Sequence, residues 1–367
     1  MLLCFATIFL YNKIYLMGNF MNSKKYKVAI IGTGRIGFTL GFDKKREQPA
    51  SHTFAVNKNP RLELLWGCDS NSENLALWKK YNPKAKVYSN TKDLFLDKSV
   101  NPDIIVVAVN EDSHLDCSIS AIKSKPSLVI LEKPVALNTN EAEKIKICAK
   151  KNNVPVLVNH ERRFALDYKI ASEWISKIGE LQFIDARLFS GLRVYRKEDE
   201  ETGFYSLLHD GTHLVDIVLY LLSFAKKTVS SESLLSNPKL VSIFKDEKNA
   251  VRNLRVNFQN DFCKDVSFNF SGRSKFFGFE VDIVGTEGRI YIGNGFAKIY
   301  LRKESKLYSG FYSLTKQKIK FPKKTLYFAN MVQNAVDFLD GKTELKSTLD
   351  TGIETLQILE QIKTLIE

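Results

Sequence analysis

The chain has few residues of the kinds that build disulfide-bonded or metal-bound frameworks. Its 367 residues include five cysteines and five histidines, and the cysteines are widely spread without any CxxC pair. Their odd number and their spacing argue against a disulfide framework and against a zinc site. His209 and His213 are four residues apart, but no third ligand stands at a convincing spacing. We therefore expect no bound metal, and free thiols fit a reducing cytoplasm.

Long apolar runs are also missing. The first twenty residues are apolar and aromatic, but the uninterrupted run ends near Leu10, short of the roughly 20 residues that a membrane-spanning helix needs. No basic residue precedes this run and no small-residue cleavage site follows it, which argues against a signal peptide. We interpret residues 1–20 as an over-long gene start, with initiation at Met21 or Met17; a short membrane-surface anchor is the alternative.

Acidic residues are the minority charge. Lys and Arg exceed Asp and Glu by 13, so the surface should attract anions such as nucleotides or phosphorylated sugars. No run of five basic residues and no aromatic-basic repeat occurs, so we favour lysines scattered for solubility and expect no nucleic-acid partner. Nucleic-acid binding is the least favoured hypothesis. The length allows two domains, and 44% hydrophobic residues can furnish a core in each.

The first half of the chain has the rhythm of an α/β domain. Short, continuous, β-branched apolar runs alternate with helical patterns, as in strands that are buried on both faces of a sheet. These runs are residues 27–31, 62–68, 104–109, 128–131 and 154–158. They predict a Rossmann-type, doubly wound parallel sheet over residues 21–160.

The pattern changes after residue 160. Strands with period-two alternation now dominate, and they predict an α+β domain over residues 161–367 with an open, largely antiparallel sheet. The expected strands are residues 181–189, 251–258, 262–270, 279–284 and 289–292. The expected helices are residues 166–177, 213–222, 325–339 and 350–366.

A glycine-rich turn follows the first predicted strand. Gly32, Gly34 and Gly37 form a GxGxxG pattern, which we expect to open a helix whose N-terminal amides approach a pyrophosphate. Arg35 and Ile36, between the glycines, are included in this predicted cofactor site. The turn therefore predicts dinucleotide binding.

Asp69 ends the second predicted strand, where a carboxylate can bond the adenosine ribose hydroxyls and so favours NAD over NADP. It lies 32 residues beyond Gly37 rather than about 20. We explain the excess by an insertion, the polar and basic segment from Phe38 to Pro49, expected to form a loop over the cofactor cleft. The alternative for Asp69 is an ordinary helix cap.

Two further motifs carry candidate chemistry. Glu132-Lys133-Pro134 ends a predicted strand, which places Lys133 at the sheet edge where α/β proteins bind ligands and where it can take or give a proton; a surface lysine beside a turn proline is the alternative. In the segment from Leu207 to Asp216, His213 and Asp216 are three apart and so share a helix face.

Together these motifs resemble the Gfo/Idh/MocA oxidoreductases, the group of glucose-fructose oxidoreductase and inositol dehydrogenase. The resemblance runs from Lys27 to the C-terminal helices. It also includes Ser51-His52, the turn from Asn110 to His114, Arg163-Phe164, Gly211-x-His213-x-x-Asp216 and Gly285-x-Glu287-Gly288. It implies a Rossmann domain joined to a C-terminal domain whose open sheet commonly supports oligomers.

In this family the lysine of EKP and the aspartate and histidine of DxGxH line the reaction site. Lys133 and His213 match, but the aspartate position is His209, and Asp210 comes one residue late. Asn110-Glu111 also departs from the common Thr-Pro. Since histidine exchanges protons near neutral pH, the set Lys133, His209 and His213 remains chemically competent.

The resemblance completes our assignment of the site. We expect further cofactor contacts from Asn110, His114 and Glu132. We expect substrate contacts from Arg163, Asp210 and Asp216.

We therefore predict an NAD-dependent cytoplasmic homo-oligomer, with NADP less favoured as cofactor. It would transfer a hydride between nicotinamide and a secondary alcohol or ketone of a sugar, nucleotide-sugar or cyclitol. The alternative is a regulatory protein that senses dinucleotide and sugar without turnover, motivated by the missing aspartate.

Overall fold

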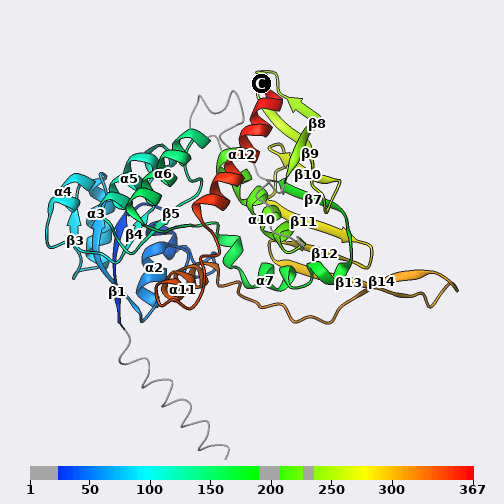
Figure 1. Cartoon of the computed structure of the whole chain (residues 1–367), viewed down its shortest axis with the longest axis horizontal. Helices are drawn as coiled ribbons and strands as arrows, with labels where there is room; N and C mark the ends of the chain where they lie inside the picture. Colours follow the sequence, from blue (N-terminus) through cyan, green and yellow to red (C-terminus); the bar gives the residue numbers. More distant parts are fainter. Residues whose placement is uncertain (1–23, 190–206, 226–234) are drawn as a thin grey trace, which may run out of the picture.

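The computed structural model describes residues 24–189, 207–225 and 235–367, and the expectation for residues 1–20 lies outside them. Two sheets stand side by side with helices between them (Figure 1). In the described ranges no helix is long and apolar enough to cross a membrane.

The N-terminal sheet consists of six parallel strands in the order β3-β2-β1-β4-β5-β6. This confirms the predicted doubly wound sheet. The bounds are β1 (Tyr26–Ile31), β2 (Leu62–Cys68), β3 (Lys86–Tyr88), β4 (Ile104–Val107), β5 (Leu128–Leu131) and β6 (Val156–Val158). The central strands β4 and β5 are buried along their whole length, which explains why their sequences are continuous apolar runs rather than alternating ones.

The first sheet has helices on both faces. Right-handed crossovers put α5 (His114–Lys123) and α6 (Thr139–Asn152) together on one face. The opposite face carries α2 (His52–Lys58) and, from the far end of the chain, α11 (Tyr327–Leu339). Helix α11 buries Phe328, Met331 and Val332 in one cluster with Val28 and Val106 of the strands. The chain therefore returns to its first domain after the second sheet. The smaller helices are α3 (Ser72–Tyr81) and α4 (Thr91–Leu96).

The glycine-rich turn does not open an α-helix, which corrects our prediction. It enters a turn and a short 3-10 helix, η1 (Thr39–Phe42), and α2 begins only at His52. The helical hydrogen bonds nevertheless resume, because His52 N donates to Ile36 O at 3.1 Å and Thr53 N donates to Gly37 O at 2.9 Å. Each bond joins residues 16 apart in place of the usual four. The insertion thus adds twelve residues between the turn and the rest of the helix. The spacing from Gly37 to Asp69 exceeds the usual value of about 20 by the same number.

The insertion is a packed element where the sequence predicted a loop over the cofactor cleft. The buried Phe38 lies in a cluster with Trp78 of α3, and Phe42 contacts Phe54 edge-on at 5.2 Å between ring centroids. The carboxylate of Glu47 accepts hydrogen bonds from the amides at the start of α11. Helices of the first domain therefore hold both ends of the insertion.

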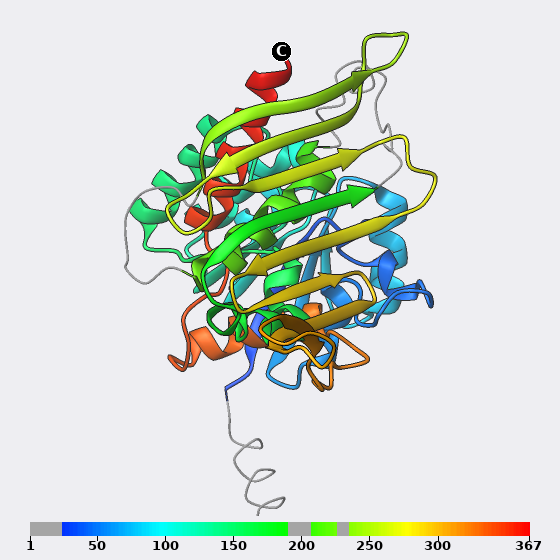
Figure 2. The same cartoon turned by 90° about the vertical axis from the view of Figure 1, so that its right-hand side faces the viewer.

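The second sheet has eight strands in the order β14-β13-β12-β11-β7-β10-β9-β8. All its pairs are antiparallel except β10 with β7, which confirms the predicted open, largely antiparallel sheet. The bounds are β7 (Leu181–Phe189), β8 (Ser236–Lys245), β9 (Val251–Gln259), β10 (Val266–Ser271), β11 (Gly278–Gly285), β12 (Gly288–Gly293), β13 (Phe296–Glu304) and β14 (Tyr312–Lys316). Figure 2 shows one broad face toward the viewer with the helices behind it.

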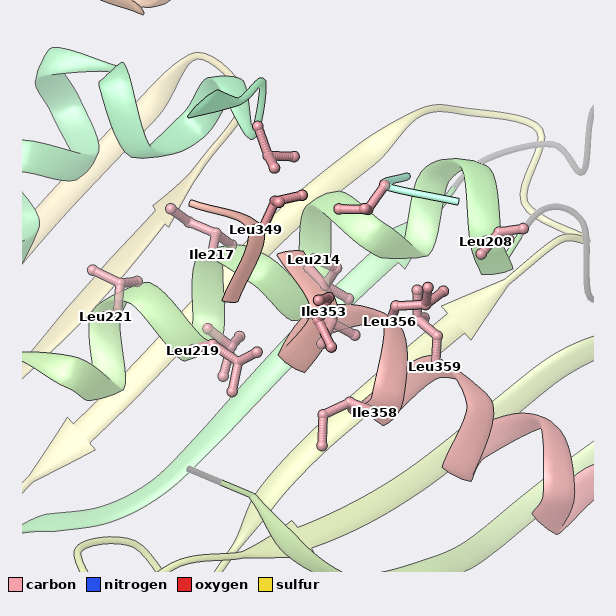
Figure 3. Close-up of a cluster of buried hydrophobic side chains, with 14 of the residues drawn as sticks. Leu208, Leu214, Ile217, Leu219, Leu221, Leu349, Ile353, Leu356, Ile358 and Leu359 are labelled. Carbon is pink, nitrogen blue, oxygen red and sulfur yellow. The ribbon is translucent and has the colours of Figure 1, made fainter. Parts of the chain in front are cut away.

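Helices fill the space between the two sheets. Helix α10 (Thr212–Ser223) packs along α12 (Leu349–Ile366) through leucine and isoleucine side chains (Figure 3). The single helix predicted over residues 166–177 is broken into α7 (Leu166–Ser172) and the 3-10 helix η4 (Ile175–Ile178). The shared apolar layer runs from the first sheet into the second, so the two sheets are held to each other by a continuous core.

Candidate active site

The three glycines of the turn have three different surroundings. Gly32 has a φ of +93°, and a Cβ there would collide with Ala108 O. A Cβ at Gly37 would collide with Gly32 O, whereas the nearest atom to a Cβ at Gly34 is Asn74 Nδ2, at 3.7 Å. The first and third glycines thus permit close packing, and the second leaves the backbone open. This is the distribution that a pyrophosphate requires.

Asp69 lies beside this turn despite its distance in the sequence. Its Oδ2 accepts hydrogen bonds from Thr33 N at 2.7 Å and from Thr33 Oγ1 at 3.0 Å, and its Oδ1 accepts one from Asn71 N at 2.8 Å. Arg35 is exposed on the turn and Ile36 is half-buried. The carboxylate, the open turn and the strand ends fit a dinucleotide with its ribose at Asp69.

Two predicted cofactor contacts lie in the interior instead. Glu132 is 5% exposed, and its Oε1 lies 2.6 Å from both His52 Nε2 and Asn159 Nδ2. Burial raises the pKa of Glu132, but these hydrogen bonds outweigh it and hold the pKa below its usual range. His114 is 1% exposed and its Nδ1 lies 2.6 Å from Pro134 O. Both side chains are therefore hydrogen-bonded within the protein, beside the turn that carries Lys133.

Lys133 connects the two domains. Its Nζ donates a hydrogen bond of 3.0 Å to the backbone oxygen of His209. His209 lies in a π-helical turn, η5 (Leu207–Gly211), that leads directly into α10. Its Nδ1 is 3.1 Å from Oε1 of Glu111, which follows β4 on the 3-10 helix η2 (Glu111–Ser113). The predicted residues Lys133 and His209 therefore meet, and Glu111 joins them.

His213 lies one turn further along, in the first turn of α10. Burial and then the positive charges of Lys133 and Arg162 hold its pKa well below the ordinary value of 6.5. The imidazole is therefore neutral at pH 7, and a neutral imidazole has one nitrogen that can accept a proton. His213 is half-buried and makes no hydrogen bond within the described residues.

Arg163 and Asp216, both predicted to contact substrate, hold each other inside the protein. Arg163 Nε lies 2.9 Å and Nη2 2.8 Å from Asp216 Oδ1, and the two residues are 5% and 1% exposed. His160 Nδ1 is also 2.9 Å from Asp216 Oδ1, so the partner of this carboxylate is His160 and not the predicted neighbour His213. Burial raises the pKa of Asp216, but Arg163 and His160 together lower it below its usual range. The two charges therefore compensate each other inside the protein.

Arg162 is the residue that sequence reasoning missed. Its guanidinium lies 3.8 Å from the ring centroid of Phe279, and its charge contributes to the lowered pKa of His213. Both arginines are on the 3-10 helix η3 (Glu161–Phe164), where successive side chains point in different directions. The sequence contained no signal to show which of the two arginines acts on His213. Asn110 is exposed and Asp210 is half-buried, and in the described residues their side chains make no hydrogen bond.

The comparisons with known structures agree with this fold. Solved structures with the same fold include a dehydrogenase from Chromobacterium violaceum (TM-score 0.74, 15% identity, covering 93% of this chain and 95% of that one). Another is the WlbA dehydrogenase from Bordetella pertussis in complex with NADH and UDP-GlcNAcA (TM-score 0.69, 16% identity, 94% and 96% covered). A third is an oxidoreductase from Agrobacterium radiobacter in complex with NAD+, L-tartaric acid and magnesium (TM-score 0.71, 16% identity, 94% and 96% covered). No curated protein sequence matches the chain.

The fold and the cofactor turn define an NAD(P)-dependent oxidoreductase of the dehydrogenase class. Residues 26–160 match the family described as oxidoreductase family, NAD-binding Rossmann fold, which is the Gfo/Idh/MocA family. The N-terminal domain of the chain is therefore similar to the NAD-binding domain of that family. This confirms the resemblance that its motifs carry.

Proposed function

We propose that the protein transfers a hydride between NAD and a secondary alcohol or ketone of a sugar, nucleotide-sugar or cyclitol. The observation that carries the proposal is the meeting of Lys133 with the segment from His209 to His213. The first comes from the carboxyl edge of the parallel sheet and the second from the other domain, and they are joined by the 3.0 Å bond from Lys133 Nζ to His209 O. Substrate binds between the two domains.

The proton chemistry follows from the charge state of these groups. The Lys133 ammonium and the neutral imidazole of His213 contact the substrate hydroxyl, and together with His209 they take or give its proton. His209 is the third proton-exchanging group at this place. When bound, NAD supplies the hydride acceptor and donor at the nicotinamide ring. Asn110, at the end of the loop that follows β4, contacts the cofactor.

NAD is preferred over NADP because of Asp69. Its carboxylate lies next to the turn that receives the pyrophosphate, and a negative charge there repels the 2′-phosphate of NADP. The two bonds from Thr33 hold the carboxylate in this place. Asp69 therefore faces the ribose hydroxyls.

The charges near His213 support an anionic sugar. Lys133 and Arg162 both lower the pKa of His213, and Arg162 also has a counter-ion, because its Nη1 lies 3.1 Å from Oε1 of Glu161. The neighbours from Bordetella pertussis and Agrobacterium radiobacter are in complex with UDP-GlcNAcA and L-tartaric acid, which are both acids. We therefore place a sugar acid or a nucleotide-sugar first among the candidates, with Asp210 as a further contact.

The first test is absorbance at 340 nm with NAD, NADP and a panel of sugars, sugar acids, cyclitols and nucleotide-sugars. With the substrate found, Lys133→Met should lower kcat by about 10²–10⁴-fold, the range for loss of a proton-transferring group. NADH affinity should stay within about twofold, since the lysine acts on the substrate oxygen. Lys123→Met, an exposed lysine, is the control. Full turnover by Lys133→Met would reject the proposed role, and NADH binding without turnover on any substrate would favour a sensor.

We also propose a cytoplasmic homo-oligomer that forms through the second sheet. Within the described residues this sheet has helices against one face, and Figure 2 shows the other face without them. Its edge strand β8 leaves Val241 and Phe244 48% and 43% exposed, and apolar exposure on an edge strand is what a partner copy would cover. Light scattering after size exclusion tests this, with Val241→Lys expected to shift the mass toward a monomer. An unchanged mass would exclude this edge.

A further inference from the structure

Two departures from the family pattern meet in space. Residue 209 is histidine where the resemblance implies an aspartate, and residue 111 is glutamate where it implies a proline. These positions are 98 residues apart in the sequence and belong to different domains. The structure nevertheless places His209 Nδ1 3.1 Å from Glu111 Oε1. A carboxylate is therefore present behind His209, and Glu111 supplies it.

We propose that Glu111 is a positioning residue that acts through His209. Together the two side chains take the place of the absent aspartate. This inference rests on the proposed function, because it assigns a role in the same reaction. Glu111 does not touch the substrate. It fixes the orientation and the tautomer of the imidazole that does.

The chemistry follows from the two nitrogens of the ring. When Nδ1–H donates to Glu111, the neutral ring has its lone pair on Nε2. A substrate hydroxyl can then pass its proton to Nε2: the O–H bond breaks, an N–H bond forms, and the oxygen keeps the electron pair. The imidazole becomes positive, and the carboxylate of Glu111 balances that charge. A carboxylate placed behind a histidine has this effect in hydrolases as well.

The surroundings hold both partners in place. The side chains of Glu111 and His209 are 12% and 30% exposed, so the pair is more enclosed than an ordinary surface ion pair. The backbone of His209 is fixed by the bond from Lys133 Nζ to its oxygen. The turn before Glu111 is fixed by His114, whose Nε2 lies 3.2 Å from Val109 O. Both contacts involve the segment around Lys133: one is made by Lys133 itself, and the other by His114, whose Nδ1 also lies 2.6 Å from the oxygen of the neighbouring Pro134.

The test compares Glu111→Gln with Asp112→Asn. The second variant removes the same charge from an exposed neighbour on the same short helix. The chain has five histidines, so ¹⁵N NMR can resolve their ring nitrogens, and the signals that disappear in His209→Asn identify this ring. We expect the Nδ1–H tautomer in the full chain and in Asp112→Asn, and a shift toward the Nε2–H tautomer in Glu111→Gln.

Turnover provides the second readout. With the substrate from the absorbance screen, Glu111→Gln should lower kcat by about 100-fold and leave NADH affinity unchanged, as expected for a group that assists proton transfer. Asp112→Asn should match the unmodified chain. The same tautomer in Glu111→Gln and the unmodified chain would overturn the inference, and so would a tautomer change without loss of kcat. The NMR result is independent of turnover, so failure of the proposed function is recognised separately, by the absence of activity in the unmodified chain.

Discussion

Asp216→Asn tests whether the buried ion pair belongs to folding or to substrate binding. The carboxylate is 1% exposed and contacts Arg163, His160 and Thr355. Removing its charge leaves the Arg163 guanidinium, itself 5% exposed, without its counter-ion. Breaking a buried pair on one side costs about 3–5 kcal/mol. We expect a loss of free energy of unfolding of this size.

The assay is urea unfolding followed by tryptophan fluorescence, with the free energy of unfolding taken by linear extrapolation. Asp210→Asn is the matched control, since the same change is made six residues earlier, on a half-buried side chain without a hydrogen bond in the described residues. We expect it to change the free energy of unfolding by less than about 0.5 kcal/mol. The double variant Arg163→Met/Asp216→Leu should recover most of the stability, because replacing both members of a buried pair by apolar residues is often neutral.

A different pattern would refute this reasoning. If Asp216→Asn costs less than about 1 kcal/mol and instead raises KM for the substrate, the carboxylate serves the substrate. The folded state of each variant is checked by NADH binding, because the cofactor turn belongs to the other domain. A variant that loses stability and keeps its NADH affinity supports the role in folding.

Three further predictions concern the cofactor turn, the adenosine site and pH. Gly34→Ala should leave stability unchanged and weaken NADH binding by at least about tenfold, or 1.4 kcal/mol, because the new methyl group faces the pyrophosphate. Gly37→Ala should destabilise the fold instead, because its Cβ meets Gly32 O. Calorimetry measures the first effect and urea unfolding the second. Asp69→Asn should lower the preference for NADH over NADPH by about tenfold, since a like charge at a few ångströms is worth on the order of 1–4 kcal/mol; an unchanged ratio of the two dissociation constants would contradict the ribose assignment. The free energy of unfolding should fall as pH drops below 6.5, by up to about 1.4 kcal/mol per pH unit for each of His114 and His213, because the folded chain holds their pKa values below those of the unfolded chain; a flat stability profile between pH 6.5 and 5 would exclude this.

The sequence predicted the strands whose burial is visible locally, whereas β8, β13 and β14, whose residues are mostly exposed or half-buried, were not predicted. A strand that is covered on both faces must be apolar at every position, so β2 and β5 were identified with their bounds. Strand β7 alternates, and its pattern also gave its bounds. The short β3, with one exposed and two half-buried residues, has no such pattern and was not predicted.

Other features depend on contacts that local spacing does not contain. The spacing from Gly37 to Asp69 is measured along the sequence and therefore includes the twelve inserted residues. The hydrogen bonds donated by His52 and Thr53 show that the helical pattern continues on the far side of the insertion. Asp216 has two partners, Arg163, which is 53 residues away, and His160, so spacing along its own helix could not identify them. The contact between His209 and Glu111 likewise joins residues of different domains, so no local spacing contains it.

The return of α11 to the first sheet has a consequence for any attempt to divide the chain. The cofactor domain is assembled from two separate stretches of sequence, and α11 closes the second of them. A fragment that ends at residue 160 would lack the helix that covers Val28, Val106 and Ile130. It would expose this apolar face of the sheet to water, and we expect it to aggregate. The first domain is therefore complete only when the chain has been made as far as Leu339, the last residue of α11.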